Sequence, residues 1–520
     1  MRRLSVIDGI FLRTHQGMGT PIALQGLWRT ADAVDRARLD RLHDALCVGP
    51  LGRRVVRSGV PGARDRWQTS IRAHPLDMAS APLRVDDILS WADGRGAGLD
   101  PRHGPGWRLS AAPLTDGGTV VALTCSHVLT DARGLVIAVE QALAASAGNG
   151  PDLEPGPRSE LAPGRGLAPG GERVLGRGPA PGGERVLGRG PAPGGEHEPG
   201  HEPAPDREPA PGRDSSAGGS VQPGGDPESD WVDAAETCAT VLVGTVRAAR
   251  TALQRARTAE RFRLWWRHEM PAEMRLRERP AGRPGGSRSP ESDSSHPVGT
   301  AVAHADLPVP ALVLRCPAQE WDRVAAASGG TPNGVFIWFV ANTLWAAGFP
   351  GREIVASLPV DTRDEPRIDN DLAMTEIIVA PGDDPGAIRA KSRAAYERRI
   401  SSPAGLPEEI LHLVPDRVAY LLSRGAGERD ILCSNIGPIP EPLHALGPHG
   451  CTGVAARAIH PGLTHARRPR TRLSGYLCRF RGDYLLTLAS LDPVRVPDVA
   501  GLHRLAADTA GRIGLPMVPW

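Results

Sequence analysis

His127 and Asp131 are the side chains in this sequence whose types and spacing suit acid–base chemistry. A neutral imidazole can take up a proton near working pH, and a nearby carboxylate can help to fix the loop that aims it. A histidine close to an aspartate is also a common structural feature of protein cores. The pair therefore marks a candidate site that the rest of the chain has to support.

A predicted strand and a predicted helix flank this pair. Residues 119–123 are a short, apolar and β-branched run that follows the turn pair Gly117-Gly118, which is typical of a buried strand. Residues 135–143 have the apolar spacing of a packed helix. His127 thus lies where a rigid scaffold passes into a loop, a position that often carries chemistry.

Composition narrows the class of protein. The 520 residues suffice for two or more domains, and 62 glycines with 51 prolines indicate a sizeable unstructured portion. A formal net charge of +2 gives no support for nucleic-acid binding. The seven cysteines are scattered without a Cys-x-x-Cys pair, which argues against a disulfide framework and against a zinc site. With no apolar run of membrane-spanning length, we expect a soluble, cytoplasmic protein.

Two parts of the chain look globular. Residues 1–150 and 300–520 both contain strands interleaved with helices, which predicts layered α/β architecture in each. The parts between them are a Pro/Gly-rich linker at 151–230, a basic helix at 231–270 and a flexible linker at 271–299. In the first linker, a 12-residue segment at 171–182 recurs at 183–194. Its composition predicts disorder, because it offers too little apolar surface to offset chain entropy.

The predicted helix at 231–270 has two interpretations. Apolar residues recur along it at three- and four-residue steps, and its second half combines arginines with Phe262, Trp265 and Trp266. One interpretation is a connecting helix with a solvated face. The other is a helix that lies on an anionic membrane or lipid droplet, or docks an acidic carrier protein. Both remain open at this point.

Motif-like stretches run from one end of the chain to the other. Ser126-His127 through Asp131-Ala132 aligns with His-His-x-x-x-Asp-Gly, and 433–438 is similar to Ser-Asn-x-Pro-Gly-Pro. The other stretches are 4–13 followed by 20–22, 322–335, and 476–492 followed by 497–498. In this order they resemble the wax ester synthase/diacylglycerol acyltransferase family. That family belongs to the superfamily of chloramphenicol acetyltransferases and peptide-synthetase condensation domains.

The resemblance implies a fold and a reaction. The fold would be α/β, with two chloramphenicol-acetyltransferase-like subdomains that form a pseudo-dimer around a tunnel. His127 would act as general base on a hydroxyl or amine acceptor that attacks an acyl thioester. The donor would be acyl-coenzyme A or a phosphopantetheinyl thioester on an acyl carrier protein, with no bound cofactor and no covalent acyl-enzyme. Asp131 would anchor the loop through an arginine that the sequence does not identify.

This sequence departs from the family pattern at several positions. Ser126 replaces the first histidine of the motif, and its hydroxyl is a candidate for substrate binding. Ala132 replaces the motif glycine, which can supply a positive φ or a backbone N–H aimed at an oxyanion. Asn333-Gly334 stands where Asn-Asp is usual. These changes predict a divergent member, which in the family's terms is lipid-type or specialised for natural-product biosynthesis.

Two further features remain ambiguous. Asn435 is a candidate substrate-binding residue, but it is equally suited to a strand-end turn. A histidine- and arginine-rich segment is either a solvated loop or a contact for the phosphates of the donor; its members are His460, His465, Arg467, Arg468, Arg470 and Arg472. The alternative to an enzyme is a non-catalytic condensation-like protein that binds an acyl chain or a carrier protein.

Overall fold

The computed structural model describes residues 2–18, 20, 22–147, 227–268, 307–398, 408–423 and 428–520. The described residues belong to one compact unit. Most of the predicted linker at 151–230, with its repeat, lies outside them, and so does all of the predicted linker at 271–299.

The first sheet carries the candidate site. Its central strands, β1 and β6, are buried along nearly their whole length, as their apolar residues predict. β6 follows a tight turn in which Gly117 adopts a φ of +92°. In spatial order the strands are β11 (Ala445–Leu446), β12 (His449–Ile459), β1 (Ala23–Thr30), β6 (Thr119–Ser126), β5 (Trp107–Pro113) and β4 (Asp77–Met78).

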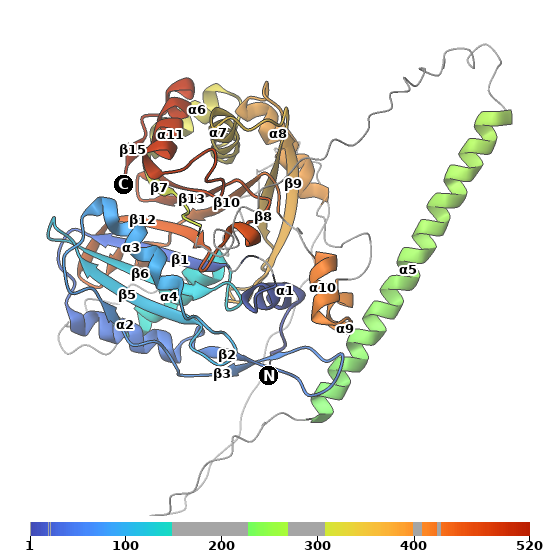
Figure 1. The fold of residues 1–520 in the computed structure, drawn as a ribbon, viewed down its shortest axis with the longest axis horizontal. Coiled ribbons are helices and arrows are strands. Elements are labelled where there is room, and N and C mark those ends of the chain that lie inside the picture. Colours follow the sequence, from blue (N-terminus) through green and yellow to red (C-terminus); the bar gives the residue numbers. More distant parts are fainter. Residues whose placement is uncertain are drawn as a thin grey trace, which may run out of the picture. The chain divides into compact units, whose positions relative to one another are not determined.

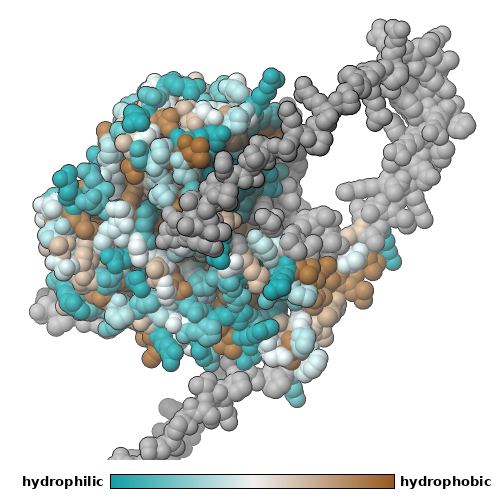
Figure 2. Space-filling model, in the orientation of Figure 1, coloured by the Kyte–Doolittle hydropathy of each residue, from teal (hydrophilic) through white to brown (hydrophobic). Residues whose placement is uncertain are grey.

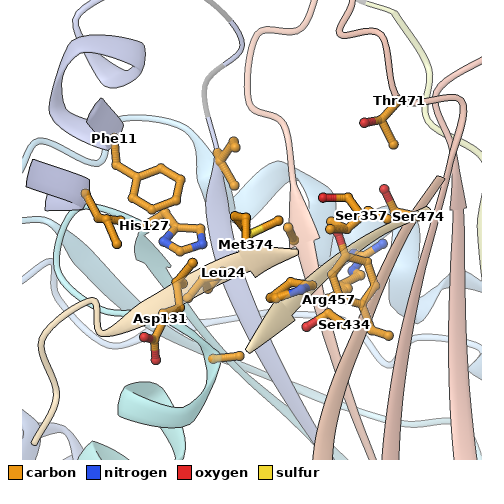
Figure 3. Close-up of a pocket in the computed structure, with 18 of the residues that line it drawn as sticks. Phe11, Leu24, His127, Asp131, Ser357, Met374, Ser434, Arg457, Thr471 and Ser474 are labelled. Carbon is orange, nitrogen blue, oxygen red and sulfur yellow. The ribbon is translucent and has the colours of Figure 1, made fainter. Parts of the chain in front are cut away.

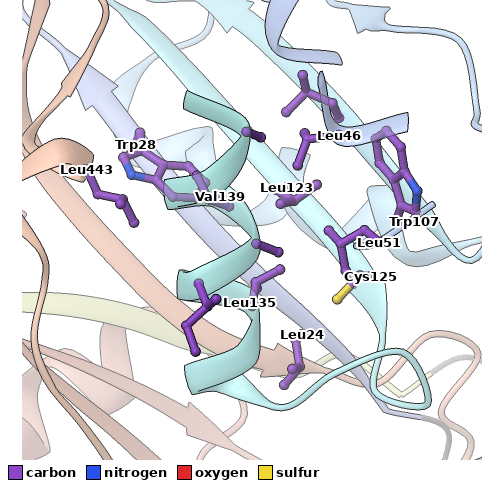
Figure 4. Packing of buried hydrophobic residues seen from close by; sticks show 14 of the residues in the cluster. Leu24, Trp28, Leu46, Leu51, Trp107, Leu123, Cys125, Leu135, Val139 and Leu443 are labelled. Carbon is purple, nitrogen blue, oxygen red and sulfur yellow. The ribbon is translucent and has the colours of Figure 1, made fainter. Parts of the chain in front are cut away.

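Helices α2 (Arg36–Val48) and α4 (Ala132–Ala147) contribute to the buried core of this sheet. Leu135 and Val139 of α4 belong to the same apolar cluster as Leu123 of β6 (Figure 4). Full burial of one such side chain contributes about 1.5–3 kcal/mol. The strand–helix pair predicted around His127 is therefore confirmed, and its packing fixes the direction in which β6 ends.

The second sheet has seven strands, and the parallel strand β10 lies inside it between β13 and β8. Figure 1 shows helices α6, α7, α8 and α11 gathered around this sheet. In order the strands are β15 (Val518–Pro519), β7 (Ala311–Pro317), β14 (Asp483–Ser490), β13 (Leu473–Phe480), β10 (Ile431–Pro438), β8 (Ile354–Asp361) and β9 (Leu372–Val379); the helices are α6 (Ala318–Ala327), α7 (Pro332–Ala346), α8 (Pro385–Arg398) and α11 (Val499–Ile513). The predicted α/β fold with two sheets is confirmed.

One predicted boundary needs correction. Residues 300–520 were assigned to the second subdomain, yet β12 pairs with β1 in the first sheet, with Ala23 opposite Ile459 and Thr30 opposite Cys451. The pairing is antiparallel and brings an apolar strand into a core that residues 1–150 leave open at one edge. Chain order alone does not reveal this exchange, because strand pairing depends on contacts between distant segments.

Helix α1 (Val6–His15) begins at a capping box. The hydroxyl of Ser5 accepts a hydrogen bond from the Asp8 backbone N–H, and the Asp8 carboxylate accepts one from the Ser5 backbone N–H. Such reciprocal bonds fix the first turn of a helix. The remaining elements are α3 (Ile88–Asp93), α9 (Ile410–Leu413), α10 (Asp416–Ser423), the hairpin β2 (Arg53–Val56)–β3 (Arg66–Thr69), and 3-10 turns at Val85–Asp87, Gly94–Gly96, Glu441–His444 and His465–Arg467.

The predicted helix at 231–270 is present as α5 (Pro227–His268). Near its start, Asp230 and Asp233 are buried and pair with Arg3 and Arg64. The first half of the helix also exposes apolar side chains, visible as a brown band in Figure 2; these are Trp231, Val232, Leu242, Val243 and Val246. Among the helices that the structure describes, none is long and apolar enough to cross a membrane.

Candidate functional site

A cavity of about 1710 Å³ is lined by residues of both sheets. Figure 3 shows His127 and Met374 facing one part of it and Ser434, Ser474 and Arg457 facing another. His127, Asp131 and Asn435, three of the four predicted site residues, line this cavity. The cavity therefore brings together residues from strand ends that are remote in the sequence.

His127 directly follows the end of β6. Its backbone N–H donates to the Ile22 carbonyl at 3.2 Å, and the Leu129 N–H donates back to the Ser126 carbonyl at 2.9 Å. These bonds make a tight turn that presents the imidazole to the cavity. Burial lowers the pKa of His127 below its ordinary value of 6.5, so the ring is neutral near pH 7. A neutral imidazole is the form that can accept a proton.

The Asp131 carboxylate is occupied by the chain itself. Its Oδ1 accepts from the Gly134 N–H at 2.9 Å, while Oδ2 accepts from Arg363 Nη2 at 2.6 Å and from the Asp371 N–H at 3.0 Å. The Arg363 and Asp131 side chains are only 5 % and 6 % exposed. Asp131 therefore holds the turn in place, and Arg363 is the arginine that the sequence left unidentified.

The segment between β8 and β9 reaches across to this turn. Besides Arg363 and Asp371, it places Asp369 against Arg53 of the separate β2–β3 hairpin, and Arg53 also donates to the Leu129 carbonyl. Arg363 and Asp369, together with the Asp371 backbone N–H, thus attach the β8–β9 segment to the turn that carries His127. The geometry of the turn depends on both halves of the chain.

Ser126 and Ala132, the altered motif positions, have structural roles. Ser126 is 1 % exposed, its Oγ accepts from the Val128 N–H at 3.4 Å, and it is not among the described residues that line the cavity. The prediction that Ser126 contacts substrate gains no support from this placement. Ala132 begins helix α4 and does not have a positive φ, so its backbone does not require glycine.

Gly134 is the glycine that this turn needs. A Cβ there would lie 2.2 Å from Thr130 Oγ1 and 2.4 Å from the Ile368 carbonyl oxygen, well inside contact distance. The close approach belongs to the same β8–β9 segment that supplies Arg363. Gly134 thus lets the β8–β9 segment approach the turn that carries His127.

Asn435 borders the cavity from the end of β10. Its Nδ2 donates to Asn333 Oδ1 at 3.1 Å, and its own Oδ1 accepts from the Gly437 N–H at 3.0 Å. The residue is exposed. These contacts suit a strand-end turn, and a substrate-binding role stays a prediction.

Several residues at the site were missed in the sequence. Phe11 stacks on the His127 ring with centroids 3.7 Å apart and planes 16° apart. Asn370 Oδ1 lies 3.2 Å from His127 Nδ1, and Asn370 in turn contacts Asp8. Phe11 and Asp8 fall in the N-terminal motif at 4–13, so that motif was a signal without an assigned role. No local pattern marks Asn370.

The basic segment after β12 also reaches the cavity. Its lining residues include His460, Arg467, Arg468 and Arg470. Arg468 lies 3.9 Å from Asp492, and Arg470 lies 3.6 Å from Asp430, so both have a carboxylate nearby. The interpretation as a purely solvated loop is therefore incomplete.

The sequence matches no protein-family model and no curated protein. Solved structures with a similar fold include the epimerization domain from the third module of tyrocidine synthetase B, with 11% identity, coverage of 98% of this chain and 95% of that one, and a TM-score of 0.48. Wax ester synthase/diacylglycerol acyltransferase from Marinobacter aquaeolei VT8 has 13% identity, coverage of 99% and 100%, and a TM-score of 0.47. Polyketide synthase associated protein 5 from Mycobacterium tuberculosis has 11% identity, coverage of 98% and 97%, and a TM-score of 0.46. Because all three TM-scores are below 0.5, we infer function from the site residues of this chain.

Proposed function

We propose that this protein transfers an acyl group from a thioester to a hydroxyl or amine acceptor, with His127 as the general base. The observation that carries the proposal is the position of the His127 imidazole, whose pKa burial lowers, at the wall of a large cavity lined by both sheets. Attack on a thioester requires loss of the acceptor's proton as the new bond forms, and a positioned base of this kind contributes about 10²–10⁴-fold.

The proposed reaction involves three groups: the nucleophilic atom of the acceptor, the thioester carbonyl of the donor and the imidazole of His127. The acceptor oxygen or nitrogen attacks the thioester carbonyl while His127 takes its proton. The tetrahedral intermediate collapses, the C–S bond breaks, and the thiol leaves with the proton returned from the imidazole. Because the thioester is already activated, no covalent acyl-enzyme is required.

Asp131 is a positioning residue in this proposal. The side-chain bonds observed for it go to Gly134, Arg363 and Asp371, which are groups of the protein that hold the turn. It attaches the turn that carries His127 to the β8–β9 segment.

The cavity supports two forms of donor. Its apolar walls suit an acyl chain, as in wax ester or triacylglycerol synthesis, and its arginines suit the phosphates of coenzyme A or of a phosphopantetheine arm. A carrier-protein donor would fit a role in natural-product assembly. Peripheral membrane contact through α5 is a further part of the proposal, supported by its exposed apolar residues.

The test is thiol release from a panel of acyl-coenzyme A and acyl-pantetheine donors, each with alcohol and amine acceptors. We expect turnover by the wild-type chain and a loss of at least 10²-fold in His127→Ala. His503→Ala is the matched control, because this histidine is exposed on α11 and does not line the cavity.

Equal turnover by His127→Ala and wild type would reject the general-base role. Tight binding of donors without turnover for any acceptor would instead favour the non-catalytic alternative. Mass spectrometry of the products distinguishes ester from amide and identifies the chain transferred.

A further inference from the structure

The first half of α5 has an apolar surface that no described part of the chain covers. Only its opening turns are anchored, through the buried carboxylates of Asp230 and Asp233. From 238 to 250, every residue whose burial the structure describes is exposed or partly exposed. The stretch 237–246 nevertheless contains no charged residue. An apolar surface of this extent marks a place where another surface binds.

The apolar residues of α5 recur with the spacing of a coiled coil. In a heptad, positions a and d alternate in steps of three and four residues and form one stripe along a helix. Apolar residues occupy eight successive positions of this kind, here called the α5 seam: Val232, Ala235, Ala239, Leu242, Val246, Ala249, Leu253 and Ala256. Val232, Leu242 and Val246 are 58 %, 67 % and 42 % exposed. A heptad pattern sustained over this length is typical of helices that pair with each other.

The charges of α5 are divided between its two halves. Residues 227–246 include four acids and no lysine or arginine, whereas 247–268 include seven arginines and one glutamate. Asp230 and Asp233 already pair within the chain, which leaves Glu236 as an exposed acid next to the α5 seam. An antiparallel partner helix places the basic half of each copy beside the acidic half of the other, whereas a parallel partner places like charges together. Charge complementarity therefore favours an antiparallel pair.

One antiparallel register satisfies the α5 seam and these charges together. With Leu242 beside the partner's Val246, each a position along the seam meets a d position of the partner. The same register sets Glu236 across from the partner's Arg250, and the two-fold axis repeats both contacts. Glu236 and Arg250 are both exposed. Opposite charges that flank an apolar seam set the partner and the direction of a coiled coil.

We propose that two copies of this protein bind each other through the antiparallel pairing of their α5 seams. The membrane contact proposed above would need the same exposed side chains, so the two uses of this helix exclude each other. Heptad spacing favours the second copy, because a lipid surface does not require it. Glu236 beside the seam also favours the second copy, because an anionic lipid surface repels this residue. The inference is independent of the thioester chemistry, because α5 does not contribute to the described lining of the cavity.

The test is sedimentation equilibrium of the 520-residue chain at protein concentrations of about 1–100 µM. We expect a monomer–dimer equilibrium for the wild type. Leu242→Asp combined with Val246→Asp places carboxylates at the centre of the pair, so the dissociation constant should rise on the order of 10²-fold or more. Val241→Asp is the matched control, because position 241 lies on the side of the helix opposite the α5 seam. That control should leave the dissociation constant unchanged.

A charge exchange tests the direction of the pairing. Glu236→Arg alone and Arg250→Glu alone each set like charges against each other at two places, so association should weaken roughly tenfold. Glu236→Arg combined with Arg250→Glu restores opposite charges and should recover the wild-type dissociation constant. Added salt should reduce the differences between these variants, because exposed charges are screened.

A wild-type chain that stays monomeric over the whole concentration range would overturn the proposal. A dimer that persists unchanged in the double aspartate variant would also overturn it, since the α5 seam would then not be the interface. If the charge exchange does not recover association, the antiparallel direction is wrong. Binding of wild-type monomers to phosphatidylglycerol vesicles, lost in the double aspartate variant, would assign the seam to a lipid surface instead. Circular dichroism and thermal unfolding of each variant separate loss of pairing from loss of the fold.

Discussion

Two strand ends border the cavity, and they are held in very different ways. At the end of β6, His127 and Asp131 are surrounded by side chains from α1 and from the β8–β9 segment, with Arg363 only 5 % exposed. At the end of β10, the exposed side chain of Asn435 bonds only to Asn333 and to the Gly437 N–H among the partners that the structure describes. A group that must keep one orientation during a reaction needs such support, whereas a group that only meets a ligand can remain mobile.

The protein also has buried and exposed ion pairs, and the two kinds differ in what they contribute to stability. Arg363 and Asp131 are a buried pair, whose partners cannot be removed singly without leaving an unpaired charge. Exposed pairs such as Arg315–Asp483, 3.9 Å apart with the arginine 49 % exposed, contribute little. The predictions below test whether the β6 end is the rigid side of the cavity.

Arg363→Met should have the largest effect. It leaves the Asp131 carboxylate buried without its cation, so the free energy of unfolding should fall by about 3–5 kcal/mol. Chemical denaturation measures this value, and Arg315→Met should change it by less than about 0.5 kcal/mol. A loss below about 1 kcal/mol for Arg363→Met would show that the buried pair contributes no more to stability than an exposed one.

Gly134→Ala should have the next largest effect. Its Cβ would meet Thr130 Oγ1 and the Ile368 backbone, so we expect destabilisation by about 1–3 kcal/mol. Gly511→Ala on α11 is the control, because nothing lies within 4 Å of a Cβ there. That control should be neutral or stabilising by up to about 1 kcal/mol, since alanine favours a helix more than glycine does. Thermal or chemical unfolding compares the two, and equal stability would refute the close packing.

Asn435→Ala should change activity only modestly. Its two hydrogen bonds, to Asn333 and from the Gly437 N–H, are exposed and contribute about 0.5–1.5 kcal/mol each, so kcat/KM should fall by roughly tenfold or less. Steady-state kinetics with the best donor and acceptor pair provide the measurement. A loss as large as that of His127→Ala would show that Asn435 takes part in the chemistry.

The smallest expected effect is in the pH profile of kcat/KM, which tests the buried environment of His127. A general base works when deprotonated, and activity falls as pH drops through its pKa. Because burial lowers the pKa of His127, the acid limb of kcat/KM should have its midpoint below 6.5. A midpoint above 6.5 that moves in His127→Asn would contradict a buried, neutral imidazole.

Local sequence patterns predicted the strand and the helix that flank His127. The strand 119–123 and the helix 135–143 both lie where period and turn residues indicated. Helix α1 was not assigned, because Asp8 and Gly9 interrupt its apolar pattern, and Asp8 turned out to serve the cap and the site. Functional residues are where local rules fail most often.

Local patterns did not predict which sheet β12 joins or which residues contact His127 and Asp131. β12 joins a sheet formed mainly by residues more than three hundred positions earlier in the chain. The bond between Asp131 and Arg363 spans 232 residues, and the one between Asn370 and Asp8 spans 362. No spacing rule connects residues at such separations.

The sequence by itself determined the elements of this protein and the pair His127 and Asp131, because hydrophobic period and short-range spacing are local properties. Tertiary structure alone decided what holds that pair: Arg363 on the carboxylate, Phe11 on the imidazole face and Asn370 at its Nδ1 edge. The reason is physical. A buried polar group takes whatever partner the packed chain brings within hydrogen-bond distance, however far away in the sequence that partner lies.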